Sequence, residues 1–98
     1  MPKVILQIAY EIDPEKREEY LRLADELKQH FAETQKKNYN IFEQKGKKNS
    51  FVEQFVCDSV EEYEALEDDL DEKADDLVNT LETMLKGGKA KYTTLVEA

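Results

Sequence analysis

The amino-acid sequence predicts a single α+β domain in which two helical segments cover one face of a four-stranded antiparallel sheet. Three observations predict it. Apolar residues alternate with a period of two in four segments, they recur every 3.6 residues in two others, and together these segments follow the order βαββαβ. Because 98 residues are enough for one domain but not for two, we expect residues 1–98 to form one unit.

The first strand and the first helix are expected at residues 4–12 and from residue 13 onwards. Val4, Leu6, Ile8 and Tyr10 fill one face of the strand. Asp13-Pro14-Glu15 opens the helix, since Asp caps free amides and Pro suits the first turn. The helix has an apolar stripe that ends at Phe31, so we expect it to stop near Thr34 or Gln35. The stripe consists of Tyr20, Leu23, Ala24, Leu27 and Phe31.

A hairpin is predicted next, from strands at residues 39–44 and 51–57. The turn at residues 45–49 contains Gly46, which can adopt positive φ. In the second of these strands the alternation divides the side chains between two faces. Phe51, Glu53, Phe55 and Cys57 share one face, and Val52, Gln54 and Val56 share the other.

A long helical region follows, beginning at Asp58-Ser59, where either residue can cap it. Its apolar stripe runs from Tyr63 to Met84 and Leu85, as one helix or as two with a joint near residues 69–72. We expect Gly87-Gly88 to end this region and residues 91–97 to form the last strand. The strands carry apolar residues on both faces. A second copy that covers the free sheet face would give a homodimer.

Charge and composition exclude several classes of protein. The net charge of −9 argues against nucleic acid as a partner, because phosphates are bound by Lys and Arg. Residues 58–82 hold twelve carboxylates and one base, Lys73. The single cysteine, Cys57, permits no intramolecular disulfide and no cysteine metal cluster, and no stretch has the length of a membrane helix. We therefore expect a cytoplasmic protein without a membrane partner.

The stretch FVEQFVCDSVEEYEAL at residues 51–66, with the order of elements, resembles the dimeric α+β barrel superfamily. It is similar in particular to the antibiotic biosynthesis monooxygenase-like domains. The resemblance implies a ferredoxin-like subunit. It also implies activities that range from cofactor-free oxygenases of aromatic polyketides or quinols to isomerases and haem-degrading enzymes. Leu66 stands where many members have His, and the chain lacks Trp, so we expect no haem and no other cofactor.

Four polar residues are candidates for binding a substrate, namely Gln7, His30, Glu53 and Tyr63. His30 is either an acid–base group at a pocket rim or a half-exposed helix residue. Glu53, if buried, would have a raised pKa and could serve as a base, or it could hydrogen bond across a dimer interface. Tyr63, with Tyr39 and Tyr92, either rims a pocket or packs in the core. The catalytic residues are unknown.

Other groups are expected to be structural. The acidic side chains of residues 67–76 spread around a helix and diverge, so they predict a solvated face and no metal site. Cys57 precedes a helix, where a thiol can become reactive, but a small buried side chain is the commoner outcome.

Two functional classes remain open after these observations. One is a non-catalytic homodimer that binds a small apolar or aromatic metabolite between its helices and its sheet. The other is a cofactor-free monooxygenase or isomerase that acts on such a metabolite. A cavity of about 300 Å³ or more with convergent polar groups would favour the enzyme, and a filled core would favour the non-catalytic class.

Overall fold

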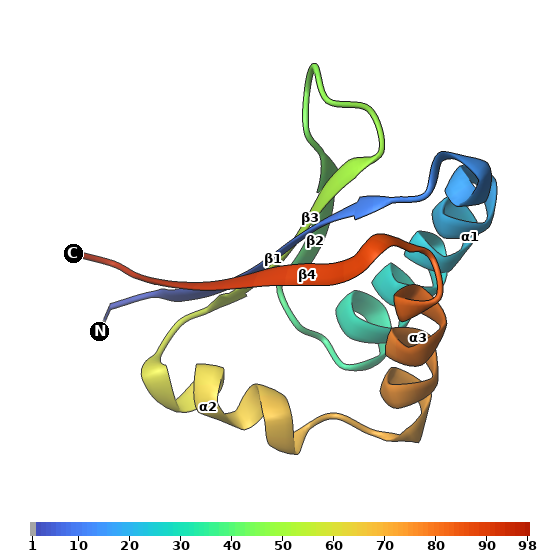
Figure 1. Ribbon diagram of the computed structural model, residues 1–98. Helices are drawn as coiled ribbons and strands as arrows, with labels where there is room; N and C mark the ends of the chain where they lie inside the picture. The colour runs from blue at the N-terminus through green and yellow to red at the C-terminus, as the bar shows by residue number, and fades with distance from the viewer. Residues whose placement is uncertain (1) are drawn as a thin grey trace.

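The computed structural model describes residues 2–98 and shows one antiparallel sheet with all the helices on one of its faces (Figure 1). The strands are β1 (Val4–Ile12), β2 (Tyr39–Glu43), β3 (Ser50–Cys57) and β4 (Leu85–Val96). They lie in the order β2-β3-β1-β4, and every neighbouring pair is antiparallel. This confirms the ferredoxin-like α+β fold that the sequence predicts.

The first helix begins as the sequence predicts. The Asp13 carboxylate accepts a hydrogen bond of 3.0 Å from the Glu15 amide, and a short 3-10 turn, Pro14–Lys16, leads into α1 (Arg17–Lys28). A wider π-helical segment, Gln29–Thr34, continues α1. The helical segment therefore ends at the expected place, and its last turns carry His30 and Phe31 into the interior.

The acidic region forms two helices, α2 (Val60–Asp68) and α3 (Glu72–Glu82). The joint falls where we place the possible break. Ser59 caps α2 through a 3.1 Å hydrogen bond from the Glu62 amide, and Asp71 caps α3 through a 2.8 Å bond from the Ala74 amide. Each helix therefore has its own N-terminal cap, and like charges crowded along one continuous helix are avoided.

The prediction that Gly87-Gly88 ends the helical region is wrong. The helix stops at Glu82, and β4 begins at Leu85, six residues before the expected start of the last strand. Both glycines have positive φ, of 75° and 71°, and they lie in a bulge. There β4 contains extra residues, because Ile12 pairs with Leu85 whereas Tyr10 pairs with Ala90. The glycines therefore permit a bulge within a strand rather than a helix cap.

The core lies between the helices and the sheet, and it is rich in aromatic rings. Tyr20 packs on Phe51 with ring centroids 4.3 Å apart, and Phe31 packs on Tyr39 and Phe55 at 5.1 and 5.2 Å. No helix of the described residues covers the opposite sheet face (Figure 1). None of the helices within residues 2–98 has the length and apolar character needed to cross a membrane.

Candidate functional site

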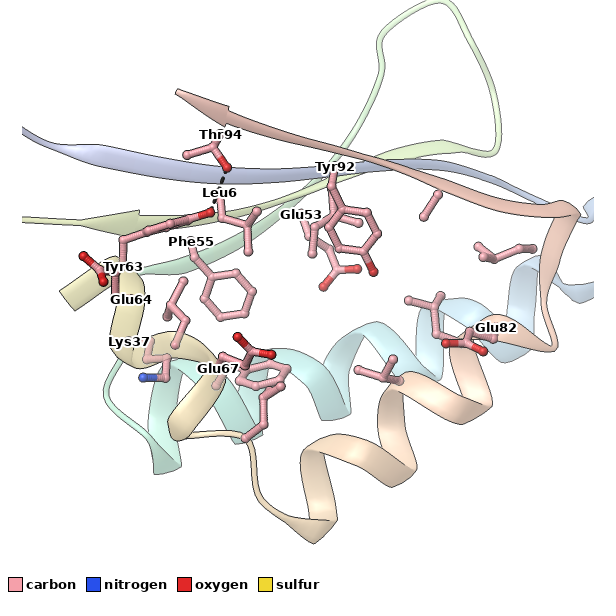
Figure 2. Close-up of a pocket in the computed structure, with 18 of the residues that line it drawn as sticks. Leu6, Lys37, Glu53, Phe55, Tyr63, Glu64, Glu67, Glu82, Tyr92 and Thr94 are labelled. Atoms are coloured by element: carbon pink, nitrogen blue, oxygen red, sulfur yellow. Dashed lines mark hydrogen bonds between the residues drawn. The ribbon is translucent and has the colours of Figure 1, made fainter. Parts of the chain in front are cut away.

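A cavity of about 890 Å³ lies between the helix-facing side of the sheet and the pair α2 and α3 (Figure 2). Its walls are mainly apolar and come from both layers. They include Leu6, Ile8, Phe55, Leu66, Leu81 and Leu85. The sheet residues belong to the face that the alternation of strands assigns to the helices, so the cavity is a part of the core that side chains leave open.

The position of α2 explains why this space is not filled. No residue of α2 is fully buried, and its main apolar side chain, Leu66, is only half-buried at the cavity wall. A hydrogen bond of 2.9 Å between the Tyr63 hydroxyl and Thr94 Oγ1 connects α2 to β4 (Figure 2). This bond ties α2 to the edge strand, but the half-buried side chains of α2 leave part of the space beneath the sheet open.

Glu53 supplies the buried carboxyl group of the cavity. It lies on β3, its side chain faces the helices, and only 4% of its surface is exposed. Figure 2 shows its carboxyl group pointing into the open space, between Phe55 and Tyr92. The Tyr39 hydroxyl donates a hydrogen bond to it. Glu53 is therefore held in place by a strand neighbour while it faces the cavity.

Burial raises the pKa of Glu53 above its ordinary value, although hydrogen bonds from Tyr39 and Tyr10 oppose the shift. Burial, followed by the charge of Glu53, raises the pKa values of Tyr39 and Tyr10. Burial also raises that of Tyr20, whose hydroxyl lies 2.7 Å from the Tyr10 hydroxyl. The tyrosines are thus neutral hydroxyl groups. The arrangement can accept a proton at one carboxyl group in an apolar setting.

Comparisons with known proteins agree with this architecture. A comparison with models of known families finds no match. The "putative monooxygenase YcnE" of Bacillus subtilis is 44% identical over 50 residues, which are 50% of this chain and 53% of that protein. The chain thus spans about half the length of this curated relative.

Solved structures are similar over nearly the whole chain. A conserved protein of Methanosarcina mazei Go1 has a TM-score of 0.84 and 10% identity, over 100% of this chain and 95% of that one. A "putative antibiotic biosynthesis monooxygenase" of Deinococcus radiodurans has a TM-score of 0.75 and 15% identity, over 97% of this chain and 91% of that one. The fold is that of the antibiotic biosynthesis monooxygenase-like domains. The likeness in fold to these domains that the sequence predicts is therefore confirmed.

The four candidate residues lie in three different places. Glu53 and Tyr63 line the cavity. Gln7 lies on the opposite sheet face, where its Oε1 accepts a 3.0 Å hydrogen bond from Gln54. His30 is neither at the rim nor half-exposed. It is buried, 8% exposed, and its Nε2 lies 2.9 Å from an Asp71 carboxylate oxygen at the start of α3. Their roles in ligand binding stay predictions.

The other residues considered from the sequence are also placed. Tyr92 lines the cavity, whereas Tyr39 supports Glu53 from the core. Cys57 is buried, and burial raises the pKa of its thiol, which favours the unreactive form. Among the described residues, no group of three or more His, Cys, Asp and Glu side chains is arranged to hold a metal ion. The sequence does not predict the hydrogen bond between the Tyr10 and Tyr20 hydroxyl groups near Glu53, although both residues lie on apolar faces that the sequence does predict.

Proposed function

We propose that the chain binds a small apolar, aromatic metabolite in the cavity between its helices and its sheet, and that it does so as a homodimer. The observation that carries the proposal is an apolar cavity of about 890 Å³ that contains one buried carboxyl group, Glu53. Ligand sites commonly have volumes of roughly 300–1,000 Å³, apolar walls and few polar groups. A ring with one hydroxyl or amine hydrogen directed at Glu53 matches both properties.

The second candidate is a cofactor-free monooxygenase or isomerase that acts on the same class of metabolite. The raised pKa of Glu53 favours it, because a carboxylate whose pKa lies above the ordinary value is a stronger base than an ordinary carboxylate. Its position in the cavity would let it remove an acidic proton from a bound ring. The names of the similar proteins, YcnE and the Deinococcus radiodurans protein, support an oxygenase among these reactions.

The open sheet face supports the homodimer. Ile5 pairs with Val56 on β3 and with Leu95 on β4, which makes an apolar row across the strands. Leu95 is 45% exposed and Phe42, further along the same face, is 52% exposed. The Gln7–Gln54 hydrogen bond lies between these apolar groups. A second copy could cover the row and match the paired amides with its own.

Ligand binding is tested by titration with N-phenyl-1-naphthylamine, a neutral aromatic fluorophore. We expect saturable binding of one probe per subunit. Val78→Phe, which places a ring on the α3 wall of the cavity, should abolish it. Leu21→Phe, at an exposed position of α1, should leave it unchanged. Binding that is equally strong in both variants would disprove the cavity as the site.

Catalysis is tested by oxygen uptake with a panel of dihydroxynaphthalenes and related quinols. We expect Glu53→Gln to lower any turnover by about 100-fold, since general bases contribute roughly 10²–10⁴. Probe affinity should change much less, because Gln has nearly the same shape. Turnover that survives in Glu53→Gln would exclude Glu53 as the base. Binding without turnover of any of these compounds by the wild-type protein would favour the non-catalytic class.

A further inference from the structure

The charged residues around the cavity are almost all acidic. Glu53 lies inside it, and the exposed side chains of Glu64, Glu67 and Glu82 line it from α2 and α3. In Figure 2 the carboxylates of Glu67 and Glu82 stand on the helices below the open space. Helices α2 and α3 belong to the segment 58–82 with its twelve acidic residues and one base. The acidic segment therefore forms one wall of the cavity.

Lys37 is the one base among the described residues that line the cavity, and its ammonium group is already paired. Its ammonium group lies 2.7 Å from a carboxylate oxygen of Asp69, in the joint between α2 and α3. Within residues 2–98, no Arg or His lines the cavity. An anionic ligand in this space would thus lose its hydration without gaining a free cation, which costs far more than burial of a neutral group.

From this arrangement we infer that the cavity selects ring compounds without negative charge, and that the exposed carboxylates of Glu67 and Glu82, which line it, repel organic anions. The inference rests on the proposed function, since it names the class of ligand for the same cavity. A cleft whose walls have a low dielectric constant concentrates the field of the charges around it. Sulfonates, phosphates and carboxylates should therefore be rejected, whereas phenols, quinols and aromatic amines are accepted.

Two fluorophores with the same ring skeleton test this inference. N-Phenyl-1-naphthylamine is neutral, and 1-anilinonaphthalene-8-sulfonate differs from it by one sulfonate. At low ionic strength we expect the wild-type protein to bind the neutral probe at least about ten-fold more tightly. In 1 M salt, where the screening length falls to about 3 Å, the preference should shrink. The double variant Glu67→Gln/Glu82→Gln should bind the sulfonate about five-fold more tightly than the wild type does.

The matched control is Glu18→Gln/Glu26→Gln, which removes the same amount of charge from the exposed face of α1. It should leave the preference unchanged. If both double variants bound the sulfonate more tightly by the same factor, the inference would be overturned, because the net charge of the protein alone would then repel the anion. Equal affinity of the wild type for both probes, with both lost in Val78→Phe, would overturn it too but leave the proposed function standing. Failure of both probes to bind in the cavity would overturn the proposed function as well.

Discussion

The hydroxyl group of Tyr39 on β2 donates a hydrogen bond to the buried carboxyl group of Glu53 on β3. The two side chains lie diagonally across neighbouring strands, because Tyr39 pairs with Phe55 and Ile41 pairs with Glu53. The Tyr39 ring packs on Phe55 with centroids 4.7 Å apart, so the donor is fixed in the core. One strand pair thus places an acid, its hydrogen-bond donor and an apolar wall at the same point of the cavity.

Replacement of Glu53 by Gln should change how stability depends on pH. The folded protein holds the Glu53 proton more tightly than the unfolded chain does, whose pKa is near the ordinary 4.5. The stability that the protonated Glu53 contributes is therefore fully present below pH 4.5, and it is lost as the pH rises through the raised pKa. In that window, the free energy of unfolding of Glu53→Gln should rise relative to that of the wild type by up to about 1.4 kcal/mol per pH unit. Urea denaturation of both proteins at pH 4, 6 and 8 measures this difference. A difference in the free energy of unfolding that stays constant across these pH values would contradict the prediction.

The matched variant is Tyr39→Phe, which keeps the ring and removes the hydroxyl group. The ionised form of Glu53 then loses a donor, so its pKa should rise further and the decline should extend to higher pH. At pH 8 we expect a loss of about 1–3 kcal/mol in the free energy of unfolding. A smaller loss at pH 8 than at pH 4 would show that the hydroxyl group does not stabilise the carboxylate.

The opposite pH dependence is expected for Glu43, at the end of β2. Hydrogen bonds from Arg17, at 2.6 and 2.9 Å, and from the Asn49 amide lower its pKa from 4.5 to about 2. The stability that Glu43 contributes is present above pH 4.5 and is lost as the pH falls through about 2. Glu43→Gln should therefore have a lower melting temperature than the wild type at pH 6, and the two melting temperatures should be equal near pH 2. Glu18→Gln serves as control, and a constant difference across this range would refute the assignment.

Local patterns explain why most of the fold could be predicted. The alternation of β1 gives its bounds, Val4–Ile12, without error, because a strand covered on one face must alternate. The break between α2 and α3 follows from like charges and from Asp71, a good cap. Glu53 could be singled out because the same alternation places a carboxyl group between Phe51 and Phe55 on the buried face.

Other features depend on contacts between distant residues, which a local pattern does not contain. Met84 continues the helical stripe, but its carbonyl accepts a hydrogen bond of 3.0 Å from the Asp13 amide, and the chain turns into β4 there. His30 meets Asp71, 41 residues further along the chain. The cavity itself depends on how α2, none of whose residues is fully buried, packs against the sheet. Tertiary packing therefore sets these features.

Gly87 should not tolerate a side chain, because its backbone adopts the left-handed conformation. Its φ is +75°, and a Cβ built on it would meet no atom within 4 Å. Gly87→Ala should therefore cost about 1–2 kcal/mol through the left-handed conformation and not through a clash. Urea denaturation measures it, with Lys89→Ala as the control in the same bulge. An unchanged midpoint for Gly87→Ala would show that the bulge adapts to a side chain.

The open sheet face gives a prediction about the oligomeric state. Light scattering should report about twice 11.5 kDa at micromolar concentrations. Val56→Arg, in the apolar row with Ile5 and Leu95, should halve this mass, because charges cannot be buried between two copies. Leu21→Arg, on the exposed side of α1, should remain a dimer. A monomeric wild type would exclude the homodimer.

His30 should prove structural, since neither of its partners, Asp71 at the start of α3 and Gln35 after the first helical segment, lines the cavity. Its Nε2 contacts the Asp71 carboxylate at 2.9 Å, and the Gln35 amide nitrogen lies 3.3 Å away. His30→Ala removes these contacts and a buried ring, so we expect a loss of about 1–3 kcal/mol in the free energy of unfolding. Gln29→Ala, at the exposed neighbouring position, should have little effect.

The same variant separates the two roles considered for His30. Because the imidazole does not line the cavity, His30→Ala should keep the affinity of the wild type for N-phenyl-1-naphthylamine at a temperature where it is folded. Denaturation and titration of the same sample measure both quantities. If the affinity fell at least about ten-fold while stability stayed unchanged, His30 would belong to the binding site after all. The contact with Asp71 would then position a ligand-binding group and not the start of a helix.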